Sequence, residues 1–180
     1  MRQNTKLLAR TALLSALTAV GAFIKIPLGV SSVTLQFFFT AMAGCLLPPL
    51  WSAASQGVYV LLGLVGLPIF TMGGGFSYVL QPTFGFLLGL IPSALVMSLL
   101  TKKSRRPLQI VLACAAGLAV LYAVGLPYMA LILNVYLGKD WSLGRLLRDG
   151  MLLFLPGDAL KIAVAAVLFP RLSVLFDKKG

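Results

Sequence analysis

Two opposite charges, Asp158 and Lys161, stand three residues apart in an otherwise apolar stretch of this 180-residue chain. Residues at this spacing share one face of a helix, so the carboxylate and the ammonium group can meet. A charge held at membrane depth costs about 2.5–3.5 kcal/mol on insertion scales, and such residues usually face an aqueous cavity, a ligand or each other. Asp158 only accepts hydrogen bonds, whereas Lys161 donates three. The pair therefore predicts a polar pocket for a ligand that has N–H donors at one point and an anion or a carbonyl at another.

A structural interpretation of the same residues stays open. Pro156 suits the first turn of a helix, and Asp158 close behind it would oppose the helix dipole favourably. The two charges would then be a helix cap combined with a local ion pair.

The composition places these residues in a membrane protein. Hydrophobic residues make up 59% of the chain and charged residues 11%, whereas about a quarter of a soluble domain is charged. The apolar runs predict six spans, at about 7–24, 33–48, 50–67, 83–100, 108–133 and 151–170. A spanning helix needs about 20 residues, so the second span is expected to be tilted or irregular. We predict one all-α domain over residues 1–180 with six transmembrane helices.

The basic residues predict how this domain is oriented. Six spans put both termini on the same side of the membrane. Three clusters lie on that side, and they hold ten of the 15 Lys and Arg residues: Arg2, Lys6, Arg10, Lys102, Lys103, Arg105, Arg106, Arg171, Lys178 and Lys179. By the positive-inside rule this side is cytoplasmic. We therefore expect a multi-pass protein of the cell membrane with cytoplasmic N- and C-termini. The basic residues behind its net charge of +11 are expected to set the orientation and to contact lipid headgroups, and not to bind nucleic acid.

Two connections on the opposite side are too apolar for ordinary solvated loops. Residues 25–36 and residues 66–83 mix apolar residues with Gly, Pro and a few hydrogen-bonding groups. Irregular backbone is tolerated at membrane depth where it lines a cavity. Asp158 lies at the same end of its span, so we expect both connections to fold back around one outward-facing pocket.

Several residues in or near these connections are candidate ligand contacts. Gly73 and Gly74, in a run of three glycines, allow positive φ angles and a close approach of the backbone to a ligand. The polar candidates are Tyr78, Gln81, Thr83, Gln36 and, at the end of the fifth span, Asn134. For each of them singly, a satisfied polar group at the membrane interface is an equally good interpretation.

The chain predicts neither catalysis nor a metal or other cofactor. It contains no histidine and no glutamate, and Cys45 and Cys114 lie in apolar stretches without the spacing of metal ligands. No glycine-rich loop ends in the Lys-Ser/Thr of a nucleotide-binding P-loop. We therefore expect that this chain does not hydrolyse ATP by itself.

A different surface is expected on the first span. Ala12 and Ala16 lie on one helix face, and small residues at this spacing let another helix approach closely. This face could pack against another helix of the same chain, or it could dock onto a partner subunit, and the sequence does not decide between the two.

Four motifs in a fixed order extend this interpretation. They are Val33-Thr-Leu-Gln36, Tyr59-x-x-x-Gly63-x-x-Gly66-Leu-Pro68-x-Phe70, Pro82-Thr83-x-Gly85-Phe86-x-x-Gly89 and Leu155-Pro-Gly-Asp158-x-x-Lys161. With them the chain resembles the BioY family, the substrate-capture (S) components of energy-coupling factor (ECF) biotin transporters. It departs from the family pattern at Gln81 and at Phe84, where glycine is commoner, and both changes could reshape the edge of the pocket.

The resemblance implies a bundle of six helices like other ECF S components, which binds biotin from outside with high affinity. The family's Asp-x-x-Lys signature maps onto Asp158 and Lys161, and the glycine loop and Tyr78 would close over the ring of biotin. The first helix, through Ala12 and Ala16, would dock onto a transmembrane coupling protein of the EcfT or BioN type that works with two ATPase subunits.

Three other functions stay open. The chain could be an S component for another vitamin, such as thiamine or riboflavin. It could be a small intramembrane enzyme that uses Asp158 as a general acid or base, although a second carboxylate partner and histidine are missing. It could also be a scaffold subunit in which Asp158 and Lys161 are a structural pair.

Overall fold

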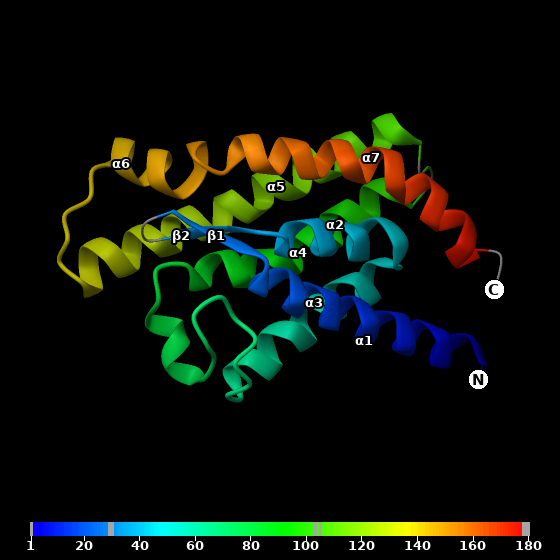
Figure 1. Ribbon diagram of the computed structural model, residues 1–180, viewed down its shortest axis with the longest axis horizontal. Coiled ribbons are helices and arrows are strands. Elements are labelled where there is room, and N and C mark those ends of the chain that lie inside the picture. The colour runs from blue at the N-terminus through cyan, green and yellow to red at the C-terminus, as the bar shows by residue number, and fades with distance from the viewer. Residues whose placement is uncertain (1, 29–30, 103, 105, 178–180) are drawn as a thin grey trace.

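The computed structural model describes the backbone of residues 2–28, 31–102, 104 and 106–177, and the side chains of residues 4–26, 32–102, 104 and 106–174. Long helices run back and forth along the longest axis of the molecule (Figure 1). In chain order the helices are α1 (Arg2–Phe23), α2 (Gln36–Leu46), α3 (Pro49–Leu64), α4 (Phe84–Thr101), α5 (Pro107–Ala130) and α7 (Leu155–Asp177). A wider turn, η2 (Leu131–Tyr136), continues α5, and α6 (Leu143–Leu147) and η3 (Arg148–Leu152) lead into α7.

Each of the six predicted spans corresponds to one of these six helices, α1 to α5 and α7. Within the described residues, four segments are long and apolar enough to cross a membrane: Asn4–Phe23, Phe84–Thr101, Pro107–Tyr136 and Leu143–Val174. The prediction of a short second segment is confirmed, because α2 has 11 residues. The last helical run begins earlier than predicted, at Leu143, where the side chain of Ser142 caps the first turn by accepting a hydrogen bond from the N–H of Arg145.

Small residues allow α4 and α5 to pack closely against each other. A Cβ atom at Gly89 would lie 3.1 Å from the side chain of Leu121, and one at Gly117 would lie 2.6 Å from that of Met97. Ser93 Oγ also donates a hydrogen bond to the carbonyl of Gly117 at 2.8 Å. Such close packing replaces the hydrophobic effect as the main source of helix association in a membrane.

The two apolar connections lie at one end of the helices (Figure 1). The first is a hairpin of β1 (Lys25–Leu28) and β2 (Ser31–Thr34), in which Lys25 is paired with Thr34. This connection is more regular than expected, because its two strands pair with each other. The second contains the short helix η1 (Phe76–Leu80). Lys25 Nζ donates to the carbonyl of Thr71 and so joins the two connections.

The start of α1, the end of α7 and the adjoining ends of α4 and α5 lie at the opposite end of the molecule (Figure 1). This arrangement agrees with an even number of crossings and brings the predicted basic clusters to one side. Lys103, Arg105, Lys178 and Lys179 of those clusters lie outside the described residues. That this side is cytoplasmic stays a prediction.

Candidate ligand-binding site

A cavity lies between the two connections and the helices α2, α4, α5 and α7. The volume of the cavity is about 110 Å³. This is well above the roughly 10–15 Å³ that a single buried water molecule needs. Its described polar lining is Ser32, Thr34, Gln36, Thr71, Tyr78, Thr83, Tyr122, Asp158 and Lys161. Its described apolar lining includes Phe37, Phe86, Leu87, Leu90, Leu121 and Phe154. The cavity therefore suits a small organic molecule that has both polar and apolar parts.

Asp158 and Lys161 form a buried ion pair on the first turns of α7. Lys161 Nζ lies 2.7 Å from Asp158 Oδ1, and the two side chains are only 10% and 7% exposed. The predicted shared helix face is thus present. The Asp158 N–H already donates to the carbonyl of Phe154 at 2.9 Å, so this residue lies inside the helix. Among the described groups its carboxylate binds side chains and no helical amide, which argues against the cap interpretation.

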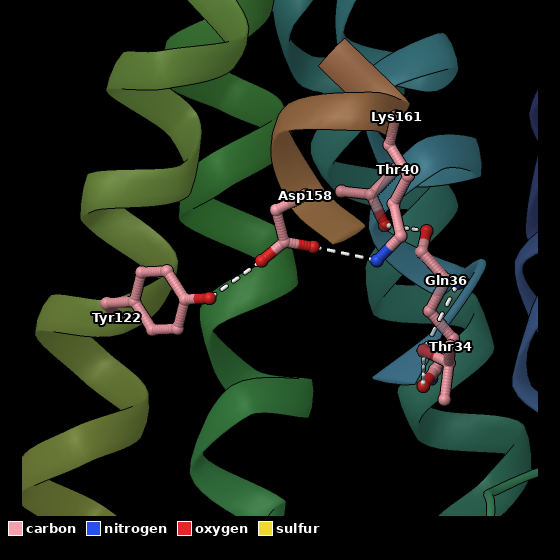
Figure 2. A network of polar contacts seen from close by, with 6 residues as sticks. All are labelled: Thr34, Gln36, Thr40, Tyr122, Asp158 and Lys161. Atoms are coloured by element: carbon pink, nitrogen blue, oxygen red, sulfur yellow. Dashed lines mark hydrogen bonds and ion pairs between the residues drawn. The ribbon is translucent and has the colours of Figure 1, made fainter. Parts of the chain in front are cut away.

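Tyr122 of α5 is the second partner of this carboxylate, and the sequence did not single it out. Its hydroxyl donates to Asp158 Oδ2 at 2.6 Å. Figure 2 shows Tyr122, Asp158 and Lys161 in one line across the site. A carboxylate has about four acceptor sites and an ammonium group has three N–H bonds. These two contacts therefore leave acceptors on Asp158 and donors on Lys161 for a ligand.

Gln36, at the start of α2, is held in one orientation on another wall of the cavity. Its Nε2 donates to Tyr59 Oη at 2.7 Å, and its Oε1 accepts from Thr34 Oγ1 at 3.0 Å. The hydroxyl of Tyr59 in turn donates to the carbonyl of Ile69 at 3.2 Å, so its oxygen accepts from Gln36. These contacts fix which end of the Gln36 amide carries the donor.

The connection between α3 and α4 contributes hydroxyl groups to the cavity. Thr71 Oγ1 and Tyr78 Oη lie 2.9 Å apart, and Thr83 also lines the cavity. The ring of Tyr78 packs 4.7 Å from the ring of Phe70, measured between centroids. Phe70 itself needs Gly63, because a Cβ atom there would lie 2.1 Å from the Phe70 ring. The Tyr59-to-Phe70 motif thus anchors this connection on α3.

Four predicted contacts are not among the described lining residues: Gly73, Gly74, Gln81 and Asn134. Gly73 has the expected positive φ of 113°. At Gly74 the close approach is to the chain itself, because a Cβ atom would lie 2.0 Å from the carbonyl oxygen of Leu67. Asn134 binds the backbone of Trp141 at 2.7 and 3.0 Å, and the carbonyl of Gln81 accepts from the N–H of Phe84 at 3.0 Å. These contacts are structural, and a ligand role for the four residues stays a prediction.

Ala12 and Ala16 are exposed on α1. The opposite face of this helix is buried and carries Leu14 and Thr18, each 0% exposed. The two alanines therefore do not serve internal packing within the described chain.

The comparisons with known proteins agree with one another. The model of the BioY family matches residues 1–178. The chain is 42% identical over 177 residues to a probable biotin transporter BioY of Lysinibacillus sphaericus, covering 97% of this chain and 90% of that protein. It is 34% identical over 169 residues to the biotin transporter BioY of Thermotoga maritima, covering 93% and 96%. Among solved structures it resembles the S-component for biotin from an ECF-type ABC transporter, with a TM-score of 0.82, 26% identity, and coverage of 95% of this chain and 92% of that one.

Proposed function

The chain belongs to the BioY family, and from this premise we propose that it captures biotin as the S component of an ECF-type ABC transporter. Membership also makes the chain a multi-pass membrane transport protein and not an enzyme, as the sequence predicted. The location of this transporter in the cell membrane is part of the proposal.

The buried Asp158–Lys161 pair is the observation that carries the proposal. Biotin has a ureido ring with two N–H donors and one carbonyl, an apolar thiophane ring and a chain that ends in a carboxylate. The cavity holds an acceptor and a donor of opposite charge within 2.7 Å of each other, beside apolar walls. A hydrogen bond to a charged group in such a site of low dielectric is stronger than in water.

In this proposal the two charged side chains have different tasks. Asp158 accepts hydrogen bonds from the N–H donors of the ligand, and Tyr122 keeps its carboxylate in place. Lys161 donates to a carbonyl or carboxylate oxygen of the ligand. Phe86, Leu121 and Phe154, which line the cavity, exclude water from the apolar thiophane ring.

Titration of the detergent-purified protein with biotin tests this function, with thiamine and riboflavin as controls. We expect selective biotin binding that Asp158→Asn and Lys161→Ala each weaken by about 10- to 100-fold, since a hydrogen bond to a charged group contributes roughly 1.5–3 kcal/mol. The matched control is Asp149→Asn, which removes a carboxylate from the partly exposed pair with Arg145 and should leave the affinity unchanged.

Each other outcome has a definite meaning. Binding at wild-type affinity in both cavity variants would remove the assigned site. Tight binding of thiamine or riboflavin in place of biotin would change the vitamin and keep the transporter class. A folded protein that binds none of the three would favour the scaffold function.

The exposed face of α1 is the proposed docking surface for a transmembrane coupling protein, which works with ATPase subunits. We expect Ala16→Trp to block co-purification with these subunits while biotin still binds, because a large side chain prevents the close approach of another helix. Ala163→Trp is the matched control, since Ala163 is also an exposed alanine but lies on α7. Intact complexes with Ala16→Trp would exclude this face of α1.

A further inference from the structure

A second group of buried polar side chains lies between α1, α2 and α3. Its centre is Gln56 of α3, and its other members include Thr18 of α1 and Thr40 of α2; all three are 0% exposed. The described lining of the cavity includes none of the three. An uncharged amide at this depth needs partners, because an unsatisfied polar group is costly in a water-free interior.

The side-chain amide of Gln56 finds partners on both neighbouring helices. Its Oε1 accepts from Thr40 Oγ1 at 2.9 Å. Its Nε2 donates to Thr18 Oγ1 at 3.4 Å and to Ser55 Oγ at 3.3 Å. Thr18 donates onward to the carbonyl of Leu14 at 2.9 Å. One side chain thus connects three helices that each present their polar groups to it.

Thr40 extends this group to the wall of the cavity. Its single O–H is shared between Gln56 Oε1 and the backbone carbonyl of Gln36, which lies 3.0 Å away and one helical turn earlier (Figure 2). Gln36 lines the cavity, and its side chain is bound by Tyr59, three residues after Gln56 on α3. Residues three apart lie on the same face of a helix. Helix α3 therefore holds Gln36 twice, at its side chain through Tyr59 and at its backbone through Gln56 and Thr40.

We propose that Gln56 is a positioning residue for ligand recognition, which places the first turn of α2 and Gln36 at the cavity and fixes α1 against the same turn. This inference rests on the proposed function in taking biotin as the ligand. Gln56 acts through Gln36 and does not itself contact the ligand. The same contacts join the cavity wall to the helix that carries Ala12 and Ala16 on its outer face.

A double-mutant cycle between Gln56 and Gln36 tests the proposal by biotin titration. We expect Gln56→Leu to weaken binding by about 3- to 20-fold, the range that corresponds to hydrogen bonds measured between membrane helices. Gln36→Leu should weaken binding as well. In the Gln36→Leu background, Gln56→Leu should add less than about a twofold loss, because the two residues act in series. An unchanged affinity in Gln56→Leu, or the same loss in both backgrounds, would overturn the proposal.

Two further variants separate positioning from a general loss of stability. Thr40→Val removes the bridging hydroxyl with almost no change of shape, and it decides the question if Gln56→Leu does not fold. Ser52→Ala is the control, since Ser52 is also 0% exposed on α3 but shares its single O–H between the carbonyls of Pro49 and Ala94. It should lower the thermal midpoint and leave biotin affinity within about twofold of wild type. Equal effects of Thr40→Val and Ser52→Ala on affinity would contradict a specific role.

Hydrogen exchange without ligand keeps this inference separate from the proposed function. We expect faster amide exchange over residues 36–46 in Gln56→Leu and Thr40→Val than in Ser52→Ala, because α2 loses one of its two polar contacts with α3, the one through Gln56 and Thr40. If wild type does not bind biotin, the proposed function fails while this exchange difference still supports the positioning role. If exchange over these residues is the same in all three variants, the positioning role fails whatever the ligand.

Discussion

At the scale of single residues, the carboxylate of Asp158 connects α5 with α7. Lys161 approaches one oxygen from α7, and Tyr122 approaches the other from α5, at 2.7 and 2.6 Å. Fixed donors on both oxygens restrict the carboxylate to one orientation before a ligand arrives. A preorganised acceptor of this kind lowers the conformational entropy that binding has to remove.

The variant Tyr122→Phe measures how much the fixed orientation of the Asp158 carboxylate contributes to biotin affinity. It removes one hydroxyl from the carboxylate and keeps the ring, so biotin affinity is expected to fall by about tenfold. Tyr128→Phe is the matched control on the same helix, because its hydroxyl donates to the carbonyl of Val79 at 2.6 Å. Titration of both variants measures the difference, and an equal loss in the two would show that the Asp158 contact is not special.

Sequence reasoning singled out five polar residues of the described cavity lining: Asp158, Lys161, Gln36, Tyr78 and Thr83. Asp158 and Lys161 are conspicuous because charges are rare in apolar spans. Tyr122 was missed because a tyrosine within an apolar run fits many environments. That Phe86, Leu121 and Phe154 line the cavity could not be predicted, because the same apolar residue types face both the cavity and the lipid.

At the scale of elements, the connection between α3 and α4 owes its shape to glycines that pack against its own backbone. Gly74 lies against Leu67 and Gly63, and the N–H of Gly75 donates to the carbonyl of Gly63 at 2.7 Å. The connection is therefore a folded unit attached to the end of α3. It brings Thr71 and Tyr78 to the cavity from that position.

We expect Gly74→Ala to displace this unit. The new Cβ atom would meet the Leu67 carbonyl oxygen at 2.0 Å, and backbone atoms cannot move aside as a flexible side chain does. Overpacking of this kind costs about 1–3 kcal/mol, so the thermal midpoint and biotin affinity should both fall. Gly57→Ala in α3 is the control, because a Cβ atom there would meet no other part of the described chain within 4 Å. Wild-type behaviour in Gly74→Ala would mean that the connection tolerates the shift.

The helices were predictable to within a few residues except at the two ends of the last helical run, whereas the conformations of the connections were not predictable. Apolar runs mark helices directly, and Pro49 and Pro107 mark the first positions of α3 and α5. The hairpin of β1 and β2 has no alternating pattern that would distinguish it from irregular chain. Its pairing depends on the helices around it, which a local pattern does not contain.

At the scale of the whole molecule, the described parts of the basic clusters and the cavity lie at opposite ends (Figure 1). Labelling of single cysteines tests the predicted orientation, and Cys45 and Cys114 give little background because both are buried. In intact cells, a membrane-impermeant maleimide should label Lys139→Cys at once and Asn4→Cys only after permeabilisation, as the positive-inside rule requires. The reverse pattern would invert the orientation.

The balance of charge in the cavity has an electrical consequence. Its described lining carries one negative and one positive side chain, so the empty site has no net charge that the membrane potential can act on. A bound carboxylate changes this balance to −1. Moving one negative charge toward a negative interior costs about 2.3 kcal/mol for each 100 mV of membrane potential that the charge crosses. Transfer of the loaded site would therefore depend on voltage, whereas return of the empty site would not.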